Sequence, residues 1–222
     1  MSSQFGREAI EIKTPRVLIR TGVASDAAAY SRYATSPANF PYGGCEPSMT
    51  PGKAAERIAL FARRTADGRF ACVLFFSRAT GDLVGYGGYN CFEVVDDAAL
   101  FLAAGTGGDP DGKMKERSAV MADVGIMLDR RFWGQGYGLE ILIGLVEGAR
   151  REVGAELYRT ETDPENKEYR ALMERAQLGG CVSGERASYD EQKEVLQWRW
   201  DARAWEEAKR KIQDKGRWVD IE

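Results

Sequence analysis

The stretch Arg131-Phe132-Trp133-Gly134-Gln135-Gly136-Tyr137-Gly138 decides how the rest of this sequence is interpreted. Three glycines fall within five residues, and glycine lets a backbone approach a ligand closely because it has no side chain. Apolar residues at helical spacing follow and predict a helix over residues 139–152. The first N–H groups of a helix are unpaired and carry the positive end of its dipole. The stretch therefore predicts an anion cradle suited to a phosphate or pyrophosphate.

Two familiar phosphate-binding motifs do not fit this stretch. No Gly-Lys-Ser/Thr follows it, so it is not a P-loop, and residues 134–138 have the wrong spacing for the dinucleotide-binding GxGxxG. A plainer interpretation is a loop whose glycines only serve the turn into a helix. The stretch alone leaves both interpretations open.

The segments around it predict one α+β domain over residues 1–222, with a core over about residues 10–205. Apolar and alternating runs predict strands at 16–20, 70–76, 83–89, 119–128, 157–162 and 194–200. Capping residues and helical spacing predict helices starting after Ser25 and at 51–64, 139–152, 168–177 and 205–213. Residues 1–15 are predicted to be a loose lead-in, 103–118 a flexible surface insertion, and 206–222 a C-terminal extension.

Composition points to a soluble globular chain in the cytoplasm. Hydrophobic residues make up 44% and charged residues 29% of the 222 residues, and the net charge is −3. This charge argues against broad binding to nucleic acid or to anionic membranes. No apolar run reaches the ~18 residues of a membrane span, and no apolar signal core is visible near Met1. The four cysteines form no CxxC pair, so neither a zinc site nor a disulfide framework is predicted.

The sequence contains no histidine. This excludes Ser-His and Cys-His nucleophile pairs, histidine-ligated metals and an imidazole base. No metal is therefore expected, and acid–base chemistry has to come from carboxylates, Tyr, Lys, Cys or water.

Several motifs in a fixed order resemble the GNAT superfamily of acyl-CoA N-acyltransferases, in particular its RimJ/RimL-type branch of ribosomal-protein N-acetyltransferases. Arg131-x-x-Gly134-x-Gly136 resembles the pyrophosphate loop of that superfamily. Residues 14–20 resemble its opening strand, and Glu165-Asn166 resembles the Asn that meets the coenzyme. The resemblance covers about residues 10–205. Gln177-Leu178 stands where the family usually has Gly-Phe.

The resemblance implies a mixed, mostly antiparallel sheet that is splayed between strands four and five, with helices on both faces. It also implies acetyl-CoA as co-substrate. The pantetheine arm of the coenzyme would hydrogen-bond to the backbone of Val124 to Leu128 in strand four, the strand predicted at 119–128, and strand five is the one predicted at 157–162. The coenzyme-binding residues it implies are Ile126, Met127, Leu128, Arg131, Gly134, Gln135, Gly136, Tyr137, Gly138 and Asn166.

Three residues are candidates for proton transfer. The resemblance suggests Tyr169 as the general acid, because it lies three residues after Asn166 and other GNAT enzymes use a Tyr to protonate the sulfur. Asp123 and Glu161, near the ends of the splayed strands, are candidate bases. The plainer alternatives are a packed aromatic ring for Tyr169 and ordinary hydrogen-bonded strand carboxylates for the two acids.

The predicted function is transfer of an acetyl group from acetyl-CoA to a primary amine. At pH 7 an α-amine of pKa ~7.8 costs about 1 kcal/mol to deprotonate, against about 4.6 kcal/mol for a lysine amine near ~10.4. The lack of histidine therefore favours a low-pKa acceptor, either a protein N-terminal α-amine or a small-molecule amine. A catalytically silent acyl-CoA-binding sensor or scaffold is the alternative.

Overall fold

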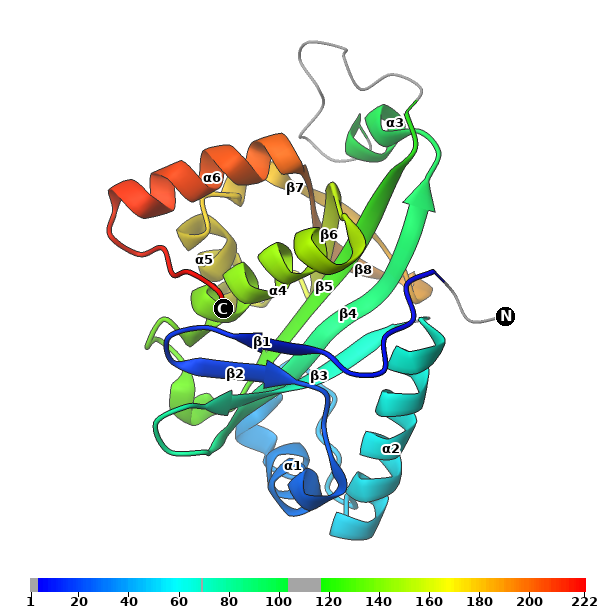
Figure 1. Ribbon diagram of the computed structural model, residues 1–222, viewed down its shortest axis with the longest axis vertical. Helices are drawn as coiled ribbons and strands as arrows, with labels where there is room; N and C mark the ends of the chain where they lie inside the picture. The colour runs from blue at the N-terminus through cyan, green and yellow to red at the C-terminus, as the bar shows by residue number, and fades with distance from the viewer. Residues whose placement is uncertain (1–3, 69, 104–116) are drawn as a thin grey trace. The chain divides into compact units, whose positions relative to one another are not determined.

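The computed structural model describes residues 4–68, 70–103 and 117–222 (Figure 1). Most of the insertion predicted at 103–118 lies outside these residues. The strands are β1 Glu11–Lys13, β2 Val17–Arg20, β3 Ala71–Ser77, β4 Leu83–Val95, β5 Ala119–Leu128, β6 Leu157–Thr162, β7 Val182–Ala187 and β8 Asp190–Asp201. The α-helices are α1 Ala27–Ala34, α2 Pro51–Asp67, α3 Ala98–Ala103, α4 Tyr137–Val153, α5 Lys167–Arg175 and α6 Ala202–Asp214.

The chain forms two compact units, each made of segments that are not contiguous in sequence. The first unit consists of Met1–Phe92, Val124–Gly148 and Val219–Glu222, and the second of Glu93–Asp123 and Ala149–Trp218. Strands β4 and β5 and helix α4 contribute residues to both units. The described registers are antiparallel except that of β5 with β6, which is parallel. The predicted α+β class with a mixed, mostly antiparallel sheet is confirmed.

In the first unit, helices cover both faces of strands β1 to β4. Leu18, Leu74 and Phe76 face a cluster of buried residues from α1 and α2, two helices that Figure 1 shows side by side. Ile19 points the opposite way, toward α4, where a Cβ on Gly144 would lie only 2.8 Å from its Cδ1. The small residue lets the helix approach the sheet closely. This packing fixes α4, and with it the glycine loop that precedes α4 in the chain.

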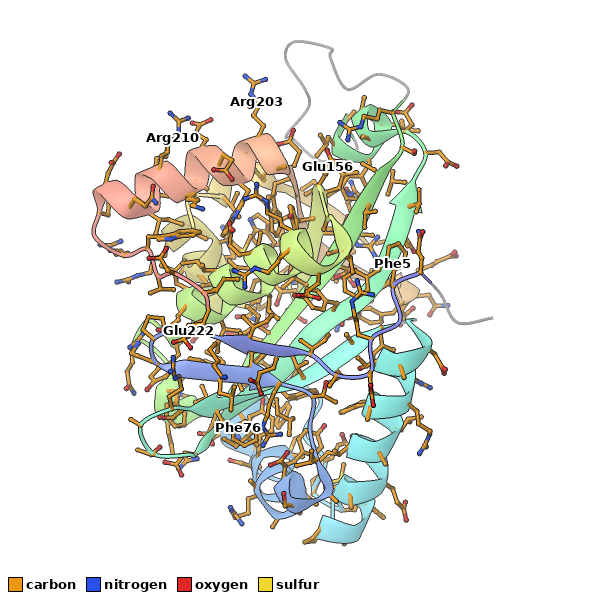
Figure 2. All side chains as sticks on the ribbon, viewed as in Figure 1. Phe5, Phe76, Glu156, Arg203, Arg210 and Glu222 are labelled. Atoms are coloured by element: carbon orange, nitrogen blue, oxygen red, sulfur yellow. The ribbon has the colours of Figure 1, made fainter. Side chains whose placement is uncertain are left out.

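The prediction of a loose lead-in over residues 1–15 is wrong for its second half. Residues 11–13 form β1, in which Ile12 pairs with Ile19 and packs against Gly148 of α4. The strand is too short for a clear alternation, and only its pairing with β2 makes it a strand. The end of the chain joins the same hairpin, because the backbone N–H of Glu222 (Figure 2) donates to the Lys13 carbonyl at 2.9 Å.

In the second unit, the strand order is β5, β6, β8, β7. One sheet face is aromatic, since Trp198 and Trp200 are buried there and the Tyr169 ring of α5 lies 5.9 Å from that of Trp198. Helix α6 buries Trp205, whereas Arg203 and Arg210 project from its exposed side (Figure 2). The sequence did not predict α3 or β7, and the strand predicted at 194–200 is the inner part of a longer β8. Charged residues in the β7–β8 hairpin obscure the alternation.

The parallel register of β5 with β6 is short. It joins Met121–Asp123 to Leu157–Arg159 and stops before the end of either strand. Within the described residues, no helix combines the length and the apolar character that a membrane span needs.

The end of α5 shows a strained residue that generates a stability prediction. Gln177 has a φ of 62°, the left-handed conformation that favours glycine, and the Leu178 N–H donates to the Met173 carbonyl as in a Schellman cap. We expect Gln177→Gly to raise the free energy of unfolding by about 1 kcal/mol, because it removes the left-handed strain. Urea titration against Gln177→Ala, which loses the same side-chain hydrogen bonds but keeps a Cβ, measures the effect. Equal stability of the two variants would contradict the prediction.

Candidate functional site

The glycine loop has the backbone that a ligand cradle requires. A short 3-10 turn at Arg130–Phe132 leads into the glycines. Helix α4 begins at Tyr137, two residues earlier than predicted. Gly134 and Gly136 have φ values of +71° and +84°, where any other residue is strained. No described atom lies within 4 Å of the position that a Cβ on Gly134 would take. The loop therefore presents open backbone at the N-terminus of a long helix.

Arg131 enters this loop with its guanidinium held in place. Its backbone N–H and Nε donate to Asp129 Oδ1 at 2.9 and 3.1 Å, and Nη2 donates to Oδ2 at 2.9 Å. This hydrogen bonding with Asp129 raises the pKa of Arg131 above its usual value. The Arg131 side chain is 65% exposed, whereas that of Asp129 is buried. A surface cation of fixed orientation thus stands at the entrance to the loop.

A second arginine, which the sequence analysis did not single out, stands at the other end of the loop. Arg16 Nε donates to Glu140 Oε2 at 2.6 Å, and Nη1 donates to the Gln135 carbonyl at 3.0 Å. Its guanidinium lies 4.5 Å from the centre of the Tyr137 ring. Glu140 is buried and also accepts hydrogen bonds from Thr14 Oγ1 and from the Arg16 backbone N–H. A carboxylate in the first turn of a helix, within a run from Leu139 to Val146 that is otherwise free of charge, is the sequence signal that reveals such a pair.

The three strand residues predicted to bind the coenzyme, Ile126, Met127 and Leu128, form the end of β5 in the same unit. The Leu128 carbonyl accepts from Trp133 Nε1 at 3.0 Å, which ties the strand to the loop. A Cβ on Gly85 of β4 would lie 2.1 Å from the Met127 carbonyl oxygen, so this approach of β4 requires glycine. The first unit thus brings together all the predicted coenzyme residues except Asn166.

Asn166 lies in the second unit, where it caps α5. Its Oδ1 accepts from the Tyr169 backbone N–H at 2.9 Å, and its Nδ2 donates to Thr162 Oγ1 at 2.8 Å. Both ends of the amide are therefore engaged within the chain. The cap orients the first turn of α5 and, with it, Tyr169.

Tyr169 is a buried residue of the second unit. Its hydroxyl lies 2.5 Å from Thr160 Oγ1. Burial raises the pKa of Tyr169 to about 12, the Thr160 hydrogen bond opposes this shift, and the charge of Asp123 adds to it. The hydroxyl therefore keeps its proton throughout the neutral range.

The two candidate bases have different surroundings. Asp123 is 1% exposed, and its Oδ2 accepts from Arg159 Nε at 2.8 Å and Nη2 at 2.6 Å. Glu161 is partly exposed and accepts from two neutral side chains, Ser188 Oγ at 2.8 Å and Gln197 Nε2 at 3.1 Å. Asp123 thus belongs to a buried ion pair, whereas Glu161 has no cationic partner among the described residues.

The acid and base candidates lie on opposite faces of β6. Arg159 and Glu161 are two residues apart and share one face, on which Asp123 pairs with Arg159. Thr160 points the other way, toward Tyr169 and α5. In the parts of the chain that the structure describes, no group of three or more metal-ligating side chains occurs.

One comparison with known proteins shows the family. Residues 16–178 match the family described as Acetyltransferase (GNAT) domain. A comparison with curated protein sequences gives no match. Among solved structures, the chain is similar to RimL, a ribosomal L7/L12 alpha-N-protein acetyltransferase in complex with coenzyme A, with 14% identity, a TM-score of 0.60, and 86% of this chain and 96% of that chain covered.

Two further solved structures show the same likeness. RimJ from Mycobacterium smegmatis, in complex with CoA-disulfide, has 16% identity and a TM-score of 0.59 over 96% of this chain and 95% of that chain. Apo FdhC, a nucleotide-linked sugar GNAT, has 14% identity and a TM-score of 0.58 over 95% and 99%. At these identities the likeness shows the fold.

The Asp123–Arg159 contact generates a stability prediction. Arg159→Met leaves a buried carboxylate without its guanidinium, and we expect a loss of about 3–5 kcal/mol in the free energy of unfolding. The double variant Asp123→Leu/Arg159→Met should recover most of this loss, because it removes both charges. Urea titrations of the parent protein, of Arg159→Met and of the double variant measure the three free energies of unfolding.

Arg186→Met is the matched control in the same unit. Its ion pair with Glu194 is exposed, at 3.5 Å, so we expect a change of only ~0–1 kcal/mol. A cost for Arg159→Met no larger than that of the control would contradict the structural role of the buried pair.

Proposed function

The chain belongs to the GNAT acetyltransferase family, and we propose that it transfers an acetyl group from acetyl-CoA to a protein N-terminal α-amine. The membership makes the protein an acetyl-CoA-dependent acetyltransferase. The proposal adds the acceptor and the residue roles. The observation that carries it is the glycine loop, whose two left-handed glycines lead into the N-terminus of α4.

The loop fits the diphosphate of acetyl-CoA. Backbone N–H groups at a helix N-terminus bind phosphate through hydrogen bonds and through the helix dipole. Arg131 and Arg16 stand at the two ends of the loop, each held by a buried carboxylate. Because these cations are already oriented, binding an anion costs little additional side-chain order.

The chemistry requires a neutral amine and a stabilised leaving group. The amine nitrogen attacks the thioester carbonyl, the C–N bond forms as the C–S bond breaks, and the amine proton passes to a base. The Tyr169 hydroxyl donates a hydrogen bond to the departing thiolate. The pKa of Tyr169, about 12, lies well above the ~8.5 of a free thiol. The thiolate is therefore the weaker base, and Tyr169 stabilises it by a hydrogen bond without giving up its proton completely.

Glu161 is the better candidate for the base. The Asp123 carboxylate is committed to Arg159, and opening that pair would separate a buried charge from its guanidinium. Glu161 is partly exposed and hydrogen-bonded only to neutral groups in the described chain, so it is able to accept a proton from water. The amine nitrogen and the sulfur are bonded to one carbon during the reaction, and Glu161 lies on the face of β6 opposite Tyr169, so the amine proton reaches Glu161 through water rather than by direct contact.

Acceptor amines of low pKa suit a site whose base is a carboxylate. A single carboxylate is a modest base, and the free energy of deprotonating an α-amine at pH 7 is only ~1 kcal/mol. A small-molecule amine is the competing acceptor, and an acyl-CoA-binding scaffold is the competing function. Measurement of free CoA release with peptides and small amines separates them. Release only with peptides supports the proposal, release only with small amines replaces the acceptor, and binding without release favours a scaffold.

The coenzyme loop generates the first prediction from this function. Gly136→Asp places a carboxylate at the loop and beside Arg16 Nη2, which would lie 3.4 Å from its Cβ. We expect the Kd for CoA to rise at least tenfold, or about 1.4 kcal/mol, in a folded protein. Calorimetric titration measures it. Gly43→Asp is the control, because Gly43 also has a left-handed φ and no described atom within 4 Å of its Cβ position. Equal affinities of the two variants would refute the role of the loop.

Tyr169 generates the second prediction. If its hydroxyl stabilises the leaving thiolate, Tyr169→Phe lowers kcat by roughly 10²-fold and leaves the KM for acetyl-CoA nearly unchanged. Steady-state kinetics measures both constants. The exposed Tyr189, changed to Phe, is the control. An unchanged kcat in Tyr169→Phe would leave Tyr169 with a packing role only.

A further inference from the structure

The first unit contains a cavity that the proposed acetyl transfer does not use. Its volume is about 410 Å³, within the range of about 300–1,000 Å³ in which small-molecule sites fall. None of its lining residues belongs to the glycine loop or to the proposed acid and base. The residues that carry the argument are Lys13, Leu18, Arg20, Asp26, Phe76 and Arg78, all in the first unit.

Two apolar side chains form the floor of the cavity. Leu18 of β2 and Phe76 of β3 are paired across the sheet, and both pack against the cluster of buried residues from α1 and α2. Phe76 therefore lies on the α1 side of the sheet (Figure 2). Leu18 is only partly buried, so a ligand that covers it removes further apolar surface from water.

Arg20 stands beside this floor in a fixed orientation. Its guanidinium carbon lies 4.3 Å from the centre of the Phe76 ring, and its Nη1 and Nη2 donate to the two oxygens of Asp26 at 2.8 and 2.9 Å. Asp26 is buried and also accepts from the Val23 backbone N–H at 2.8 Å. The negative charge of Asp26 is therefore compensated within the wall of the cavity.

Two further cations, Arg78 and Lys13, line the cavity and can be reached from solvent. Arg78 Nη1 donates to the Thr14 carbonyl at 2.6 Å and to Glu222 Oε1 at 2.9 Å, whereas its Nε and Nη2 make no hydrogen bond with the described residues. Lys13 Nζ lies 2.9 Å from Glu11 Oε1. Both ion pairs are exposed, with side-chain exposures from 36% to 62%, and such pairs contribute little to stability. An external anion can therefore share or replace Glu11 and Glu222.

The lining thus combines an excess of positive charge with an apolar floor. It carries three cations against the single carboxylate of Asp26, because Glu11 and Glu222 pair with two of the cations from outside the cavity. A guanidinium or an ammonium group forms strong, charge-assisted hydrogen bonds with a carboxylate. An inorganic anion would leave the floor uncovered, and a neutral apolar molecule would leave the cations without a ligand.

We propose that this cavity binds a small organic carboxylate, with its apolar chain on Leu18 and Phe76 and its charge at Arg78 and Lys13. Arg20 completes the wall and covers the Phe76 ring. The ligand class is therefore an aliphatic or aromatic monocarboxylate. The inference goes beyond the proposed acetyl transfer and does not depend on it, because it concerns binding at other residues.

The test uses three compounds that separate charge from apolar contact. Hexanoate has a carboxylate and an apolar chain, acetate has the carboxylate without the longer chain, and hexanamide has the chain without the charge. In NMR titrations at constant ionic strength, we expect hexanoate to shift signals of the lining residues and to bind at least tenfold more tightly than the other two. Acetate or hexanamide binding as tightly as hexanoate would overturn the proposal.

Three variants test the residues themselves. Arg78→Gln removes a cation and should raise the Kd for hexanoate at least fivefold. Glu222→Gln removes the carboxylate that competes for Arg78 and should lower this Kd at least twofold. Arg63→Gln is the control, because Arg63 is an exposed cation of α2 that does not line the cavity. Equal effects of Arg78→Gln and Arg63→Gln, or weaker binding to Glu222→Gln, would refute the site. Urea titration confirms that each variant is folded.

Discussion

Glu140 is the residue on which the organisation of the first unit depends. Its buried carboxylate lies in the first turn of α4 and accepts three hydrogen bonds, from Thr14 and from the backbone and side chain of Arg16. A negative charge is favoured at this end of a helix, and a buried one requires such partners. The same carboxylate therefore joins the opening hairpin to the helix and holds Arg16 against the glycine loop. The fold of the first unit and the position of the glycine loop thus depend on one interaction.

The second unit uses charge in another way. Its aromatic face, with Trp198 and Trp200, packs against helices, whereas its polar face carries the ion pairs of Arg159 and Arg199. Both arginines are mostly buried and are paired with carboxylates, so their charges are compensated within the sheet. Glu161 differs, because neutral groups alone hydrogen-bond to it in the described chain. This difference is the reason why we propose Glu161, and not Asp123, as the base.

Much of the fold was predictable because several elements carry strong local signals. Strands β5 and β6 have the bounds that the apolar runs predicted, and Thr50 caps a helix beginning at Pro51, as its position before proline indicated. The elements that were not predicted, β1, β7 and α3, are short or rich in charge. Strands β1 and β7 have too few apolar residues to show a period, and α3 is wholly apolar but only 6 residues long. The two strands are ordered by pairing, β1 with β2 and β7 with β8.

The sequence by itself determined the chemistry available to this protein. The absence of histidine leaves acid–base chemistry to carboxylates, Tyr, Lys, Cys or water, and Gly134 and Gly136 supply a backbone conformation that only glycine adopts freely. Only the tertiary structure decided how each ionisable residue is used. Asp123 and Glu161 are equivalent as strand carboxylates in the sequence, but Arg159 pairs with one and neutral groups surround the other. These pairings join residues 36 and 27 positions apart, and no local pattern encodes them, because the energy of a charge depends on the neighbours that folding brings to it.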